Sequence, residues 1–224
     1  MKKKVLVTLL VIALALVSVS AKDLGIKVGG ELGWGIQTGS LKIGESSYEE
    51  YMKTTNNGFA INLTGEYAFD KNWSVKADFG LMFAGKAKSE VSDEGDISYL
   101  MESSGLYIDF AVDGKYTYAI NKQFSVSGLA GIEMVSGYLA KLKEVDDEDL
   151  KHSKNTGFGI NLGVEGGYNL NDDITIVAGF DFSWLFINTN SMIKEAKEKA
   201  DKKGYKLSVA NFFMRPYVGA TYAF

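Results

Sequence analysis

The sequence predicts an all-β protein whose eight strands form an antiparallel up-and-down transmembrane β-barrel. Three segments repeat one hairpin pattern, in which alternating apolar residues meet a three-residue polar turn beginning with Asp or Asn and then alternate again. These segments are Tyr67–Val75, Tyr118–Val126 and Tyr168–Ile176, about 50 residues apart. The composition, with 25 Gly, 12 Tyr, 13 Phe and a single Pro in 224 residues, is typical of a strand-rich single domain.

The first 21 residues have the features of a signal peptide. Lys2–Lys4 form a basic start, Val5–Val17 is an uncharged apolar run too short to span a membrane comfortably, and Val19–Ala21 is a small-residue cleavage site. We therefore expect residues 1–21 to be removed and residues 22–224 to form one outer-membrane β-barrel domain. Cleavage would change the formal charge from −4 to −7, which argues against nucleic-acid binding. The absence of Cys excludes disulfides and a lipid-anchored cysteine.

Period-2 alternation of apolar residues predicts where the eight strands lie. The expected strands are Leu24–Gln37, Gly58–Phe69, Trp73–Phe83, Leu106–Ile120, Phe124–Leu139, Gly157–Leu170, Ile174–Phe186 and Ser208–Phe224. The four remaining connections are long and charged: Thr38–Asn57, Ala84–Ser103, Ala140–Asn155 and Ile187–Lys206. Short turns and long connections alternate strictly, so an up-and-down sheet places all short turns at one end and all long loops at the other.

The less apolar face of the strands indicates which side of the sheet is the inside. A lipocalin-type barrel hides its apolar face around a ligand, whereas an outer-membrane barrel turns that face toward lipid. The other face is rich in glycine, for example Gly80, Gly131 and Gly163, which suits a narrow lumen better than a soluble exterior. The charged residues expected in this lumen are Lys27, Glu31, Glu66, Lys76, Asp78, Asp109, Asp113, Lys115, Glu133, Glu165, Asp181 and Arg215.

Aromatic residues gather near both ends of the apolar face, as they do in the two interfacial girdles of outer-membrane barrels. On the short-turn side these are Tyr67, Phe69, Trp73, Tyr116, Tyr118 and Tyr168, and on the loop side Trp34, Phe59, Phe83, Tyr138, Phe158, Trp184 and Phe186. Each could also be an ordinary strand residue. Together they favour lipid outside the barrel, in the outer membrane of a diderm bacterium, with the long loops extracellular.

The signal peptide, the eight alternating strands, the short turns and the final strand Tyr217–Phe224 together resemble the small outer-membrane β-barrels of the OmpA, OmpX and opacity-protein type. In that family a terminal aromatic residue preceded by alternating apolar residues is the signal read by the barrel-assembly machinery. The resemblance implies that this role falls to Val218, Ala220, Tyr222 and Phe224. It also implies contact with outer-membrane lipid and lipopolysaccharide-like lipid, and a monomer. Pro216 departs from the pattern of a closed ladder, and we expect a local bulge there.

The first short turn predicts how the lumen charges are arranged. If Phe69 lies opposite Trp73, the register sets Glu66 opposite Lys76 with both side chains inward. The expected lumen has twice as many acids as bases, so Arg215, with its five donors, is expected to bridge more than one carboxylate. Eight strands leave an interior only about wide enough for side chains to fill, so the network is expected to plug the lumen.

The sequence offers little that points to an enzyme. Some eight-stranded barrels resembling the deacylase type use a His and a Ser two positions apart, but His152 and Ser153 are adjacent and lie in a loop. The acidic run Asp146–Asp149 lacks the ligand spacing of a calcium loop. We expect no catalytic residues, no cofactor and no metal.

Three function classes remain. The preferred one is a non-catalytic barrel whose surface loops serve envelope structure, surface interaction or adhesion, since loops carry recognition on a rigid scaffold. A small pore or solute conduit is the alternative, and a lipid A-modifying enzyme is the third. An extracellular ligand would bind through the loops, where Ser191–Lys203 has the composition of a short lysine-rich helix, suited to acidic partners or only to solubility.

Overall fold

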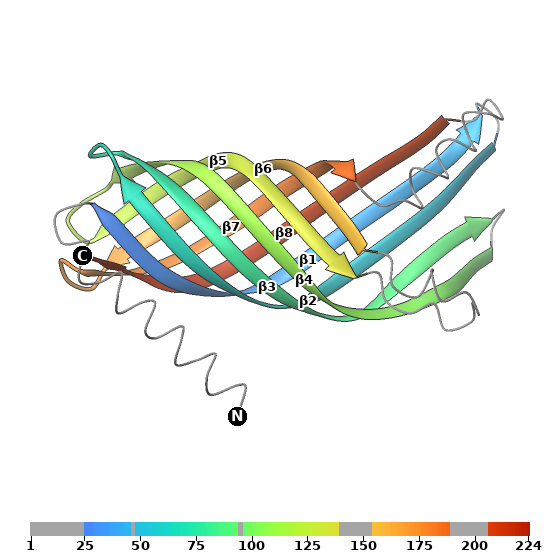
Figure 1. Ribbon diagram of the computed structural model, residues 1–224, viewed down its shortest axis with the longest axis horizontal. Helices are drawn as coiled ribbons and strands as arrows, with labels where there is room; N and C mark the ends of the chain where they lie inside the picture. The colour runs from blue at the N-terminus through green and yellow to red at the C-terminus, as the bar shows by residue number, and fades with distance from the viewer. Residues whose placement is uncertain (1–24, 46–47, 94–95, 139–153, 189–205) are drawn as a thin grey trace.

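The computed structural model describes residues 25–45, 48–93, 96–138, 154–188 and 206–224. They form a closed antiparallel barrel in which each strand pairs with its sequence neighbours and the first strand pairs with the last (Figure 1). The strands are β1 (Ile26–Glu45), β2 (Tyr48–Ala68), β3 (Trp73–Asp93), β4 (Asp96–Ala119), β5 (Phe124–Tyr138), β6 (Lys154–Asn169), β7 (Ile174–Asn188) and β8 (Lys206–Ala223). Among these residues, no helix is long and apolar enough to cross a membrane.

The three short turns lie together at one end of the barrel with the C-terminus, and the β-strands run from there to the opposite, loop end (Figure 1). Each turn is fixed by a side chain that caps its own backbone. Asp70 accepts a hydrogen bond from the N–H of Asn72, Asn121 from that of Gln123, and Asn171 from that of Asp173. This is the local preference of Asx residues for turns, and it confirms the predicted arrangement of short turns at one end.

Two of the four connections expected to be loops are largely strand. β1 and β2 pair without a shift from Ile26 opposite Tyr67 to Glu45 opposite Tyr48, and β3 and β4 pair as far as Asp93 opposite Asp96. The prediction for Thr38–Asn57 and Ala84–Ser103 was therefore wrong, because antiparallel pairing satisfies the backbone there despite the charged sequence and two register shifts between β3 and β4. These hairpins and β8 run past the ends of β5, β6 and β7 (Figure 1).

Pro216 does not cause the expected bulge. It lies opposite Phe180 in β7, and the register between β1 and β8 is the same on both sides of it. What changes is the ladder to β1, where no pairing joins Trp34 and Gly35 to β8. Proline lacks the N–H that a ladder bond would use, so the barrel loses local pairing at this point while the register is kept.

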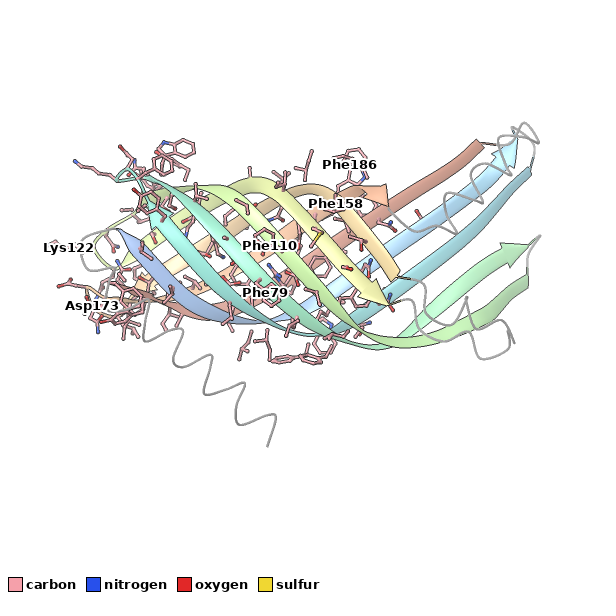
Figure 2. All side chains as sticks on the ribbon, viewed as in Figure 1. Phe79, Phe110, Lys122, Phe158, Asp173 and Phe186 are labelled. Atoms are coloured by element: carbon pink, nitrogen blue, oxygen red, sulfur yellow. The ribbon has the colours of Figure 1, made fainter. Side chains whose placement is uncertain are left out.

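The two faces of the barrel wall differ as the alternation predicts. Figure 2 shows Phe79, Phe110, Phe158 and Phe186 on the barrel wall, with Lys122 and Asp173 at the short-turn end. The four phenylalanines are each between 40 and 53% exposed, so the outer face is apolar. The buried charged residues lie on the inner face, so the part of the fold that can carry chemistry is the lumen.

Candidate functional site

The candidate site is the barrel lumen, into which the wall turns its charged side chains. Of the twelve charged residues expected there, eleven are buried, and none of these is more than 7% exposed. The twelfth is Lys27, whose side chain is 37% exposed. Its ammonium lies 3.9 Å from Glu66, which is the outermost contact of the network toward the short turns.

Two lysines organise the half of the lumen nearer the short turns. The Lys115 ammonium lies 2.8 Å from a carboxylate oxygen of Glu66 and 2.6 Å from one of Glu165. The Lys76 ammonium lies 2.6 Å from Glu31 and 3.2 Å from Glu165. Each lysine thus bridges two carboxylates, which gives the buried charges the pairing that they need in a region of low polarity.

Two further groups complete this half of the network. The Asp78 carboxylate lies 3.5 Å from the Lys76 ammonium. Tyr217 donates a hydrogen bond of 2.9 Å from its hydroxyl to Glu165, and its ring lies below the Lys76 ammonium, 4.9 Å from nitrogen to ring centre. Glu165 therefore receives contacts from β3, β4 and β8 at once, and it is the centre of this half of the lumen.

The turn register places Glu66 directly opposite Lys76, as the sequence predicts. Their ion pairs, however, are formed with other strands, because Lys76 contacts Glu31 on β1 and Glu66 contacts Lys115 on β4. Strands in a barrel are tilted and staggered, so contacts across the lumen also join positions that are not register partners. Register alone was therefore not enough to predict the ion pairs.

Arg215 bridges two carboxylates, as the excess of acids predicted. One guanidinium nitrogen lies 2.6 Å from Asp109 and another 2.9 Å from Asp181. Asp181 is its register partner on β7, whereas Asp109 reaches it from β4. Since all three residues are at most 2% exposed, this is a fully buried triad of one cation and two anions.

A second buried group contains carboxylates and neutral side chains. The Asn161 side-chain nitrogen lies 3.0 Å from both carboxylate oxygens of Asp113. Ser183 lies 2.9 Å from the Asn161 side-chain oxygen and also contacts Glu133. The sequence analysis expected only charged residues in the lumen network and left out Asn161 and Ser183, although both fall on the inward phase of strands that carry lumen acids.

Glycines on the inner face make room for these side chains. A Cβ added to Gly80 would lie 2.2 Å from the Asp109 carboxylate, and one added to Gly179 would lie 2.4 Å from the Tyr217 ring. A Cβ added to Gly163 would likewise lie 2.6 Å from a carboxylate oxygen of Asp181. These lumen glycines therefore leave the space that large side chains of neighbouring strands occupy, which explains why this face is both glycine-rich and charged.

An apolar layer closes the lumen on the loop side of the charges. It consists of Ala60, Met82, Tyr107, Val135, Leu185 and Phe213, none more than 4% exposed. The Tyr107 hydroxyl accepts a hydrogen bond of 2.6 Å from Asn56. Sequence reasoning missed this layer, since it expected only small and charged residues inside. The signal was present, because Phe213 lies two residues from Arg215 and Val135 two residues from Glu133.

The aromatic girdle residues lie on the outer face wherever their side chains are described. Twelve of the thirteen are between 36 and 63% exposed, and the side chain of Tyr138 falls outside the described residues. On the short-turn side, Trp73 packs edge-on against Tyr116 with ring centres 5.0 Å apart. In the terminal strand, Val218, Ala220 and Tyr222 are exposed, and the Tyr222 ring lies 4.8 Å from that of Phe224.

The loop features considered for chemistry lie outside the described residues: His152, Asp146–Asp149 and Ser191–Lys203. The signal peptide lies outside them as well. Within the part of the chain that the structure describes, no group of three or more His, Cys, Asp or Glu residues has the geometry to hold a metal ion.

Comparison with known proteins identifies the kind of barrel. A family model of the outer membrane protein β-barrel domain matches residues 9–223. Among solved structures, Neisserial surface protein A is similar with a TM-score of 0.54 at 10% identity, covering 89% of this chain and 97% of that one. OprG from Pseudomonas aeruginosa is similar with a TM-score of 0.50 at 13% identity, covering 87% and 94%. A comparison with curated proteins gave no significant match.

Proposed function

Because the chain belongs to the outer membrane protein β-barrel domain family, we propose that it is a non-catalytic barrel with a sealed lumen that anchors surface-exposed loops in the bacterial outer membrane. The loops and the extended hairpins then serve envelope structure, surface interaction or adhesion. The single observation that carries the proposal is the filled lumen. An interior this closed leaves the ends of the barrel as the surfaces available to partners.

Two layers support the sealed lumen. The paired charges around Lys76, Lys115 and Arg215 occupy the half nearer the short turns, and the apolar layer around Met82 and Phe213 occupies the other. An ion crossing the barrel would have to break buried ion pairs and then enter a dry apolar layer, and both steps are costly.

The direction of insertion follows from the difference between the two ends of the barrel, one with short turns and the other with extended hairpins. In barrels of the outer membrane, short turns face the periplasm and longer loops face outward. On this basis the extended hairpins β1–β2 and β3–β4 project from the cell surface. Outer-membrane lipid contacts the apolar outer face, and the assembly machinery reads the strand that ends at Phe224.

Electrical recording in a planar lipid bilayer tests the sealed lumen. Refolded protein is expected to give no steady conductance, because neither layer offers a water-filled path. Steady channels in the wild type would support the alternative function, a small pore or solute conduit. The excess of acids in the lumen favours that alternative, because carboxylates attract cations. Eight carboxylates stand against four basic groups, and three of the basic groups are buried.

Loop replacement tests the surface role. Residues 139–153 and 189–205 are each replaced by a short Gly-Ser turn, and cells carrying each variant are assayed for binding to surfaces coated with lipopolysaccharide or extracellular-matrix protein. We expect at least one replacement to reduce binding while unboiled protein still migrates as a folded barrel on a gel. Unchanged binding in both variants would contradict a role for these loops in recognition.

A further inference from the structure

Four buried side chains form a row of hydrogen bonds just below the apolar layer. Asp113 on β4, Asn161 on β6 and Ser183 on β7 follow one register row across the strands, since Asp113 lies opposite Gly131, Gly131 opposite Asn161, and Asn161 opposite Ser183. A Cβ added to Gly131 on β5 would lie 2.5 Å from an Asp113 carboxylate oxygen, so this glycine leaves the Asp113 carboxylate room beside Asn161. Glu133, two residues further along β5, contacts Ser183 and ends the row.

The number of protons available in this row can be counted. Ser183 has one hydroxyl proton but lies within hydrogen-bond distance of two acceptors, the Asn161 side-chain oxygen and a Glu133 carboxylate oxygen. If Asn161 donates from its nitrogen to Asp113, its oxygen must accept the Ser183 proton. The contact between Ser183 and Glu133 then has no proton unless Glu133 brings one.

Turning over the Asn161 amide leads to the same requirement for one additional proton. If the Asn161 amide is turned over, its nitrogen donates to Ser183, whose proton is then free for an ionised Glu133. The Asn161 oxygen now faces Asp113, and that contact has no proton unless Asp113 brings one. With both carboxylates ionised, either orientation leaves two acceptors face to face in a buried site.

We propose that Glu133 and Asp113 bind one proton between them, shared through Ser183 and Asn161. The proton belongs to the row and not to one residue, as in other coupled acid pairs. Burial supports this, because Glu133 is 3% exposed, Asp113 is 1% exposed, and one Glu133 oxygen has no hydrogen-bond partner in the structure. A second uncompensated negative charge here would have to be held without water.

The acidic side chains around the row also favour a bound proton, and the two cations that face it oppose this. Asp109 on β4 and Asp181 on β7 face Glu133, and Arg215 on β8 is the cation that faces it. Arg215 is already bound to those two aspartates. On the other side of the row, Asp181 and Asp78 face Asp113 together with Lys76, which pairs with Glu31 and Glu165. The shared proton thus offsets part of an acid excess that the bases in contact do not neutralise.

Infrared spectroscopy of the refolded barrel in lipid, with 13C-labelled carboxyl groups, tests the shared proton directly. The wild type at pH 7 is expected to show the carbonyl band of a protonated carboxylic acid. Glu133→Gln and Asp113→Asn should each lose the band, because an amide at either end supplies the missing donor and lets the other acid ionise. Glu66→Gln is the matched control and should keep the band, since Glu66 is a buried acid that contacts Lys115 and Lys27.

Urea unfolding at increasing pH gives an independent measurement. A folded state that binds one more proton than the unfolded state loses stability as pH rises, so the wild type should unfold at lower urea at alkaline pH than at pH 7. This loss should be smaller in Glu133→Gln. A wild type without the carboxylic acid band at pH 7, or a band equally strong in wild type, Glu133→Gln and Asp113→Asn, would overturn the shared proton.

Discussion

The half of the lumen near the short turns is filled with charges paired across the barrel, whereas the half near the loops is closed by apolar side chains. In the first half, Lys115 and Arg215 each contact two carboxylates and Lys76 contacts three. Among the described residues, removing Arg215 leaves Asp109 and Asp181 without another ion-pair partner. In the second half, Met82 and Phe213 belong to a cluster of buried apolar side chains, where a smaller side chain leaves a cavity. The ionic half therefore depends on the identity of single residues, and the apolar half on total volume.

The largest effect should come from Arg215→Ala. It leaves Asp109 and Asp181 as stranded buried charges, which we expect to lower the free energy of unfolding by about 3 to 5 kcal/mol in urea. Adding Asp109→Asn and Asp181→Asn to the same chain should restore much of the loss. A single mutant as stable as the wild type would show that the triad does not hold the ionic half together.

The apolar half should respond to volume. Met82→Ala is expected to cost about 3 kcal/mol, because the buried layer loses contacts and gains a cavity. Met82→Leu keeps the volume and should cost less than about 1.5 kcal/mol by the same urea measurement. If the two variants were equally destabilised, the layer would depend on the methionine itself and the contrast between the halves would fail.

A change outside the lumen separates stability from assembly. Phe224→Ala removes one aromatic ring from the outer face, which should cost about 2 kcal/mol in the refolded protein. In cells we expect a much larger decrease of folded, heat-modifiable protein, if the terminal residues are the signal that the family resemblance implies. Normal levels of folded Phe224→Ala in cells would contradict that role.

The smallest effect should be that of Lys27→Ala. Lys27 lies at the edge of the network, partly exposed and 3.9 Å from Glu66, so its loss should change the free energy of unfolding by less than about 1 kcal/mol. Lys115→Ala removes a buried lysine that contacts the same glutamate and should cost several times more. Equal effects would mean that burial does not set the strength of these pairs.

Much of the fold could be predicted because period-2 alternation and Asx turns are local signals. They predicted the number of strands, the inner and outer faces and the register that sets Glu66 opposite Lys76. The length of the hairpins could not be predicted in this way. Register shifts interrupt the alternation between Thr55 and Gly58 and between Ala84 and Ala87, and the sequence beyond them is polar and charged.

The lumen contacts were less predictable for a different reason. Which residue meets Lys76 depends on the tilt and stagger of the whole barrel, which no single hairpin determines. The apolar layer was missed because the lumen of a membrane barrel was expected to be polar throughout. Extending the inward phase of β5 beyond Glu133 to Val135, and of β8 beyond Arg215 to Phe213, would have found it.

The close contact between lumen glycines and large side chains of the next strand limits how this sequence can diverge. Because the Asp109 carboxylate occupies the space where Gly80 would carry a Cβ, Gly80 can become larger only if Asp109 becomes smaller or turns away. Gly163 and Asp181 are joined in the same way, as are Gly179 and Tyr217. In an alignment of close homologues these pairs should therefore co-vary, although their members lie far apart in the chain. A larger residue on one strand would then be accompanied by a smaller one on the adjacent strand, and the total side-chain volume in the lumen would stay the same.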